Sequence, residues 1–257
     1  MKKEESLPFQ EALARQDMYR FLSAVFLSPP QQDLLKRIAD TELLQGLSTL
    51  LGREAVADLK EFATMANSHQ YFESIKQEYM DLFAVPAGRY VFPFEDIYRG
   101  IAVNGQQERG PLLGERAIAV AGMYREAGVE IDRTCKELPT HIGVELAFMS
   151  FLCEGEALAI LEQEETKDIE STRYRDLQVR FLREHLNQWF PQLRQSIQRN
   201  AKSQFYRGLA LITEAFLAQD TAGLLSRRHS ETRILRGKGG KNGSVKYPGH
   251  STQCGTE

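Results

Sequence analysis

The amino-acid sequence predicts an all-α fold, and three observations support this. Apolar residues recur at the i, i+3/i+4, i+7 spacing of one helix face through most of the chain. Strand signals are nearly absent, and the run YVF at residues 90–92 is too short to build a sheet. Residues 142–152 are apolar on nearly every face, which is typical of a helix in the middle of a bundle.

Four helices are predicted in the first third of the chain. The first ends at Pro29 and Pro30, because proline disfavours a helical conformation in the residue before it. Residues 32–66 predict two shorter helices around a break near residues 46–52, and residues 68–83 predict a fourth helix. The next stretch, AVPAGRYVFPFEDIYRG at residues 84–100, holds too many prolines and glycines for a helix and is expected to be irregular.

Four more helices are predicted over residues 113–127, 142–163, 174–189 and 191–217. The acidic stretch at residues 162–170 is expected to be a solvated helix end followed by a connection. From residue 222 the chain is rich in Gly, Ser and basic residues and has little apolar periodicity. The sequence therefore predicts a helical domain over residues 1–221 and a flexible, disordered basic tail over residues 222–257.

The composition is that of an ordinary globular protein, with 42% hydrophobic residues, 26% charged residues and a net charge of −3. This balance gives no general preference for nucleic acid or an anionic membrane, and no run approaches the roughly 18 apolar residues that span a bilayer. The acidic, interrupted start does not predict a secretory signal. Cys135, Cys153 and Cys254 have no CxxC spacing and are expected to be reduced thiols. We expect a cytoplasmic protein that binds no nucleic acid and has no stable membrane insertion.

Sequence motifs for catalysis are absent. None of G-x-S-x-G, H-E-x-x-H or G-x-G-x-x-G occurs, and neither do the repeated Glu-x-x-His pairs of a helical di-iron site. The one pair at metal-ligand spacing is His141 with Glu145, at i, i+4 on a helix face. A Ser-His-Asp or Cys-His site assembled from distant segments stays open at this point. We expect no enzyme, no metal and no other cofactor.

Residues 137–149, ELPTHIGVELAFM, are the most informative stretch. Pro139 places a helix boundary before it, and the Thr140 hydroxyl is expected to cap the helix by accepting from a backbone N–H of its first turn. Glu145 lies within the apolar helix and needs a partner, because a bare buried carboxylate is costly; His141, one turn earlier, is the expected partner. Two interpretations stay open. The pair either only fixes the helix entry or stands at the mouth of a ligand groove.

Three blocks carry a resemblance to a known family: EYMDLFAVP at residues 78–86, PFEDIYRG at residues 93–100, and ELPTHIGVELAFM. They are similar, in the same order, to the Tyr-x-x-Leu-Phe, Pro-aromatic-x-x-x-Tyr and E-x-P-D-H blocks of the TorD/DmsD family. Members of that family are cytoplasmic chaperones that mature molybdenum-containing redox enzymes. The first and last predicted helices also resemble those of the family, so the resemblance covers about residues 10–220.

The resemblance implies a single bundle of about ten helices without a cofactor. It implies binding to the apo catalytic subunit of a molybdenum-containing oxidoreductase, through its twin-arginine leader or another segment, until the molybdopterin cofactor is in place. A leader offers two guanidinium groups and an apolar run, so its receptor should combine carboxylates with an apolar, aromatic-rimmed groove. The expected client-binding residues are Tyr79, Leu82, Phe83, Pro93, Phe94, Glu95, Asp96, Tyr98, Glu137, Pro139, Thr140, His141 and Glu145. A monomer and a domain-swapped dimer are both expected possibilities.

One departure from the family pattern is Thr140, which stands where the family has an aspartate. The helix cap survives this change, but the negative charge does not, so Glu95, Asp96 or Glu137 is expected to supply it. Two alternatives to the chaperone stay open. A helical adaptor or regulatory protein would use the same groove for an unrelated partner, and a helical metal-dependent hydrolase would carry bound metal.

Overall fold

The computed structural model of the chain describes residues 6–66, 68–100, 102–103, 106–107, 110–130, 136–161 and 165–238. The helices in these ranges are α1 (Leu7–Leu27), α2 (Gln32–Ile38), α3 (Thr41–Leu51), α4 (Arg53–Met65), α5 (His69–Tyr79), α6 (Glu95–Tyr98), α7 (Glu115–Glu126), α8 (Ile142–Leu161), α9 (Glu165–Phe181), α10 (Asn187–Asn200) and α11 (Gln204–Lys238). The other elements are two π-helical turns, η1 (Met80–Ala84) and η2 (Leu182–Leu186), and one antiparallel pair, β1 (Ala102–Val103) with β2 (Gln106–Gln107). The predicted all-α bundle is confirmed.

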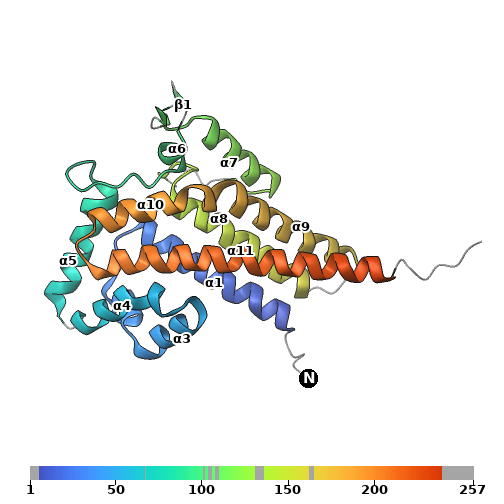
Figure 1. The fold of residues 1–257 in the computed structure, drawn as a ribbon, viewed down its shortest axis with the longest axis horizontal. Helices are drawn as coiled ribbons and strands as arrows, with labels where there is room; N and C mark the ends of the chain where they lie inside the picture. The colour runs from blue at the N-terminus through green and yellow to red at the C-terminus, as the bar shows by residue number, and fades with distance from the viewer. Residues whose placement is uncertain are drawn as a thin grey trace, which may run out of the picture.

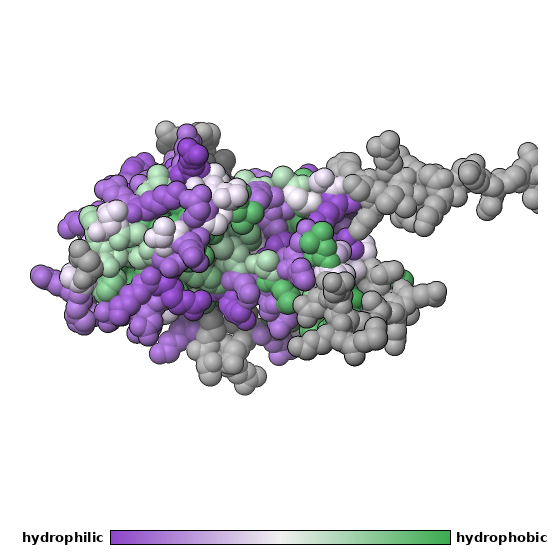
Figure 2. All heavy atoms as spheres, turned by 90° about the horizontal axis from the view of Figure 1, so that it is seen from below, coloured by the Kyte–Doolittle hydropathy of each residue, from purple (hydrophilic) through white to green (hydrophobic). Residues whose placement is uncertain are grey.

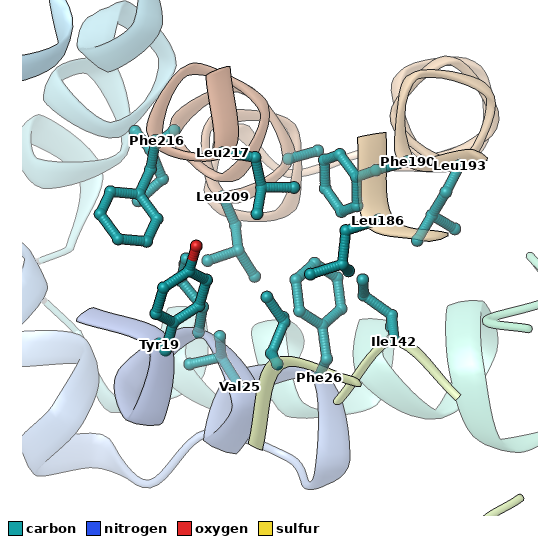
Figure 3. Close-up of a cluster of buried hydrophobic side chains, with 14 of the residues drawn as sticks. Tyr19, Val25, Phe26, Ile142, Leu186, Phe190, Leu193, Leu209, Phe216 and Leu217 are labelled. Carbon is teal, nitrogen blue, oxygen red and sulfur yellow. The ribbon is translucent and has the colours of Figure 1, made fainter. Parts of the chain in front are cut away.

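The middle of the bundle is α8, which packs between α1 and α9, while α11 packs along α4 and α10 (Figure 1). Figure 3 shows how the core joins the first helix to the last two. The ring of Tyr19 in α1 lies 4.8 Å from that of Phe216 in α11, and the ring of Phe26 lies 6.3 Å from that of Phe190 in α10. The two ends of the described chain therefore share one apolar core.

Residues 32–66 form three helices, where the sequence predicted two. Asp40 begins α3, because its carboxylate accepts hydrogen bonds from the backbone N–H groups of Glu42 (3.0 Å) and Leu43 (2.9 Å). Gly52 separates α3 from α4 with a φ of +93°, a backbone conformation that favours glycine. The predicted break is at Gly52, and the cap at Asp40 makes an additional one.

The helix predicted over residues 191–217 is wrong in its boundaries. α10 begins directly after the π-helical turn η2 and continues through Pro191, its fifth residue. α10 then ends at Asn200, and the start of α11 is held by Glu78 of α5. The Glu78 carboxylate accepts from the backbone N–H groups of Lys202 and Ser203, the latter at 3.1 Å. A carboxylate at this point favours a helix start, because the N-terminal end of a helix carries partial positive charge.

The last helix continues to Lys238, so the predicted helix end near Leu217 is wrong. The end of α11 extends past the neighbouring helices (Figure 1), and Leu224 is still buried against the bundle. Part of the predicted tail is therefore helical, while residues 239–257 lie outside the described ranges. The division into a domain and a tail stays a prediction. α9 likewise begins at Glu165, earlier than predicted, and includes part of the acidic stretch.

The cysteines and the lengths of the apolar helices were also predicted from the sequence. Cys153 is a buried free thiol, whereas Cys135 and Cys254 lie outside the described residues. Among the helices of the described ranges, none is both long and apolar enough to cross a bilayer.

Candidate functional site

The blocks around residues 94 and 141 meet in space and form the frame of the site. Their backbones run antiparallel, with an isolated β-bridge between Phe94 and His141. The Ile142 N–H donates to the Pro93 carbonyl at 2.8 Å, and the Glu95 N–H donates to the Thr140 carbonyl at 3.0 Å. These bonds fix the start of α6 against the start of α8.

This frame holds three buried carboxyl groups, which we call the acidic corner: Glu95 (0% exposed), Asp96 (2%) and Glu145 (0%). Buried carboxylates are costly unless they are paired and hydrogen-bonded. Their partners therefore decide what the site can do.

Glu95 has two cationic or polar partners. Arg99 Nη1 donates to Glu95 Oε1 at 2.6 Å and also to the Glu184 carbonyl oxygen. His185 Nδ1 lies 2.8 Å from Glu95 Oε2, and it carries the proton of this pair when the carboxylate is ionised, because a carboxylate only accepts. Glu95 therefore ties α6 to the π-helical turn η2.

Asp96 is bound by the residue that replaces the family's aspartate. The Thr140 hydroxyl donates to Asp96 Oδ2 at 2.6 Å, and both side chains are buried. The predicted helix cap by Thr140 is therefore wrong, because its hydroxyl is turned toward α6. His141 caps α8 instead, since its Nδ1 accepts from the Gly143 N–H at 3.0 Å.

Within the described ranges, Glu145 has a hydrogen-bond donor on one oxygen only. Trp189 Nε1 donates to Glu145 Oε2 at 3.0 Å, while Oε1 is buried with no hydrogen-bond donor beside it in the described structure. Burial raises the pKa of Glu145 well above its usual value. The nearby charges of Glu95 and Asp96 and a hydrogen bond with the Glu95 carboxyl raise it further, against the lowering effect of the Trp189 hydrogen bond. Either a proton or an incoming cation satisfies Oε1 in this environment.

The predicted side-chain pair of His141 with Glu145 is not formed. His141 Nε2 lies 3.9 Å from Glu137 Oε2 at the half-exposed edge of the corner. Burial lowers the pKa of His141 to about 4, so its ring is neutral at pH 7. A neutral ring is also required for the cap, because Nδ1 accepts a hydrogen bond there.

Aromatic side chains border the acidic corner. The ring of Tyr98 stacks on that of Trp189 at 5.7 Å, and the ring of Phe94 meets that of His141 edge-on at 5.4 Å. Phe94 and Tyr98 are both half-buried, so each presents part of its ring to the surface. The Pro139 carbonyl accepts from the Tyr124 hydroxyl at 2.8 Å, which fixes the loop before α8.

Three of the predicted site residues belong to the core instead. Leu82 and Phe83 are buried, and the Phe83 ring packs against those of Phe26 and Tyr206 at 5.8 and 5.7 Å. The Tyr79 hydroxyl donates to the Phe26 carbonyl at 3.2 Å, and burial raises the pKa of Tyr79 to about 12. These residues do not form the surface of a groove.

Sequence reasoning missed Arg99, His185 and Trp189. Arg99 stands four residues after Glu95, so helical spacing could have found that pair. His185 and Trp189 lie far along the chain from the carboxyl groups that they contact, and no local pattern marks them. The site thus draws on α6, α8, η2 and α10.

A separate hollow is a surface groove of about 840 Å³ lined by α1, α2, α3, α4 and α11. Its floor is largely apolar and includes Leu59 and Phe216, while Arg20, Arg37 and Arg227 are among the charged residues that line it. Figure 2 shows such a mixture on one face, where green apolar residues are bordered by purple hydrophilic ones. None of the residues of the acidic corner lines this groove. We take the acidic corner as the candidate site for a cationic ligand, because it holds three buried carboxyl groups and one of their oxygens has no donor among the described residues.

Metal binding has no support from residue clustering. Among the described residues, no group of three or more His, Cys, Asp or Glu side chains has the arrangement of a metal site.

The raised pKa of Glu145 predicts a specific pH effect on stability. The folded state keeps the Glu145 proton to a higher pH than the unfolded state does, so stability falls as pH rises above 4.5, by up to about 1.4 kcal/mol per pH unit. Glu145→Gln, which mimics the protonated form, should remove this slope and be the more stable protein at alkaline pH. Denaturant midpoints between about pH 7.5 and 9 measure it, a window above the range between about 4 and 6.5 in which the burial of His141 changes stability.

The control for this measurement is Glu126→Gln, because Glu126 is an exposed carboxylate bound by Arg180 at 2.9 Å. Its pH profile in the same window should follow that of the unchanged protein. A slope that Glu145→Gln leaves intact would show that Glu145 is ionised in the folded state.

The chain is similar in sequence to known proteins. The family described as nitrate reductase delta subunit matches residues 50–195. The perchlorate reductase assembly chaperone protein of Dechloromonas aromatica (strain RCB) is 29% identical over 125 residues, 49% of this chain and 51% of that protein. Chaperone protein TorD of Colwellia psychrerythraea (strain 34H) is 23% identical over 239 residues, 84% of this chain and 94% of that protein.

The chain thus spans about half the length of the first relative and nearly all of the second. The matched residues 50–195 include every member of the acidic corner together with Arg99, His185 and Trp189. The resemblance to TorD/DmsD-type maturation chaperones is confirmed, and the chain belongs to the nitrate reductase delta subunit family.

Proposed function

We propose that this protein is a chaperone for the catalytic subunit of a molybdenum-containing oxidoreductase and that its acidic corner receives a cationic segment of that subunit. Two relatives that carry the name of chaperone support the first part. The observation that carries the second part is Glu145 Oε1, a buried carboxyl oxygen without a donor beside two further buried carboxylates.

The chemistry of the corner suits an arginine-containing ligand. A guanidinium group offers several N–H donors in a planar fork, and carboxylates bind it with two parallel hydrogen bonds. Phe94 and Tyr98 add half-exposed aromatic surface on which apolar residues after the arginines pack. A twin-arginine leader has both features. In this proposal Asp96, which is hydrogen-bonded by Thr140, supplies the negative charge that the aspartate at the position of Thr140 supplies in other members of the family.

The function needs recognition alone. In this proposal the chaperone works in the cytoplasm, uses no cofactor and catalyses no reaction. It holds the leader of the apo subunit until the molybdopterin cofactor is inserted, and this delays export.

Co-purification tests the proposal. The tagged full chain is recovered from its native organism after anaerobic growth on a respiratory substrate, and bound proteins are identified by mass spectrometry. A molybdoenzyme catalytic subunit that still carries its leader is the expected result. An unrelated partner recovered reproducibly would support an adaptor instead, and metal bound in stoichiometric amount would support a hydrolase.

Binding of the client segment should depend strongly on salt. Because the contact pairs guanidinium groups with carboxylates, we expect the dissociation constant to rise about tenfold between roughly 50 and 500 mM salt. Isothermal titration of the full chain with a leader peptide measures this, and a peptide with both arginines replaced by glutamine is the control. An affinity that does not change with salt would show that the carboxylates do not bind the arginines of the client.

A further inference from the structure

The acidic corner already contains a guanidinium group, that of Arg99. Arg99 directly follows α6, a helix of four residues, and its Nη1 donates to Glu95 Oε1 at 2.6 Å. The side chain is 19% exposed, whereas that of Glu95 is fully buried. Arg99 therefore lies between the buried carboxylate and the surface and covers Glu95 Oε1.

An incoming guanidinium group meets Arg99 before it meets Glu95. The second oxygen of Glu95 lies 2.8 Å from His185 Nδ1, and the His185 ring is buried, so that side of the carboxylate is closed as well. Glu95 becomes available to a client only when Arg99 moves away.

The backbone of α6 is fixed, whereas the Arg99 side chain reaches the surface with 19% of its area exposed. Gly110 passes so close to α6 that a Cβ atom there would lie 2.2 Å from the Asp96 carbonyl oxygen. The Glu95 N–H is bonded to Thr140 on the other side. Exchange at the corner therefore requires a rotation of the Arg99 side chain, which breaks its bonds to Glu95 and to the Glu184 carbonyl while α6 keeps its place.

Replacing one guanidinium group by another keeps the charge of the corner constant. Glu95 loses a charge-assisted hydrogen bond and gains an equivalent one, so the burial of the carboxylates does not change. A lysine ammonium is a compact point charge without the planar fork and replaces Arg99 less well. Exchange against an internal arginine thus selects ligands that carry arginine.

We propose that Arg99 is an internal occupant of the guanidinium site and that an arginine of the client displaces it; this inference rests on the proposed function. Arg99 then sets the threshold for binding. Segments without a suitably placed arginine leave the corner closed. A client with two arginines satisfies both Glu95 Oε1 and Glu145 Oε1, and the second guanidinium group takes the place of the Glu145 proton.

The test compares Arg99→Gln, Arg99→Lys and the unchanged full chain. The probes are two labelled synthetic peptides, one with two adjacent arginines before an apolar helix-forming run, the other with lysines in their place. Arg99→Gln should bind the arginine peptide about tenfold more tightly than the unchanged chain, and Arg99→Lys about threefold, because lysine competes less well. The lysine peptide should bind more weakly to the unchanged chain.

Arg20→Gln is the matched control, because Arg20 is an exposed arginine that pairs with Asp17 on α1, outside the corner. It should leave the affinity unchanged. If Arg99→Gln loses its far-UV helicity, Arg99→Lys decides by the same comparison.

Two results overturn the inference and differ in what they say of the proposed function. The first result is that the unchanged chain binds the arginine peptide and that Arg99→Gln and Arg99→Lys bind it with equal or weaker affinity. Arg99 is then a structural partner of Glu95, and the proposed function stands. No binding of the arginine peptide to any of the three proteins removes the guanidinium site itself, and with it the leader contact of the proposed function.

Discussion

Replacing Glu95 by alanine should lower the free energy of unfolding by about 3–5 kcal/mol, because removing one partner of a buried ion pair leaves the others uncompensated. Arg99 and the buried His185 both lose the carboxylate that they contact. For a chain of this size we expect a fall in Tm of roughly 10 °C. Thermal and denaturant unfolding of the full chain measure the effect.

The control is Glu126→Ala, because Glu126 is an exposed carboxylate that also binds an arginine, Arg180. Its cost should stay below about 1 kcal/mol, the usual value for exposed ion pairs. Glu95→Gln keeps the shape of the side chain and separates binding from folding, and it should still lose affinity for an arginine-containing client. Equal costs for Glu95→Ala and Glu126→Ala would show that Glu95 is solvated and that the corner is open to water.

Replacing Phe83 by alanine should cost about 3–5 kcal/mol, as is typical of a large buried side chain reduced to a methyl group. The Phe83 ring contacts those of Phe26, Tyr79 and Tyr206, so its removal leaves a cavity among α1, α5 and α11. Denaturant unfolding followed by far-UV circular dichroism measures it.

The matched control is Phe151→Ala, because Phe151 lies on the outer face of α8 and is 36% exposed. That variant should lose less than half as much stability. If Phe83→Ala keeps full stability and loses only client binding, Phe83 belongs to the binding surface, as the family resemblance first indicated.

Periodicity alone predicted the parts of the fold that depend on local pattern. The end of α1 and the starts of α5 and α8 were predicted closely. Apolar residues at helical spacing, or on nearly every face in α8, mark these helices, and prolines flank α1 and α8. The late helices were placed wrongly for tertiary reasons. The carboxylate of Glu78, more than a hundred residues earlier, holds the start of α11, and burial of Leu224 favours helix beyond the predicted end.

The site shows the same division between local and distant information. The resemblance named Glu95, Asp96, Thr140 and Glu145, which the structure brings together, and it also named Leu82 and Phe83, which the fold buries in the core. The side-chain pairs of the site could not be predicted from the spacing of residues along a helix. His141 and Glu145 share a helix face by sequence, yet Glu145 bonds to Trp189 and His141 turns to its own helix cap. The partner of each side chain depends on how α10 packs against α6, and the local sequence of neither helix predicts that packing.

The indole signal of Trp189 reports whether a client binds at the acidic corner. Trp189 is the only tryptophan in the chain, and its Nε1–H donates to Glu145 inside the acidic corner. A ¹⁵N–¹H spectrum therefore contains one indole peak that reports on the proposed client site. Titration with the leader peptide of the co-purified subunit should shift this peak in the unchanged chain and leave it in place in Glu95→Gln. An indole peak that does not move when the unchanged chain is saturated with peptide would show that the client binds elsewhere.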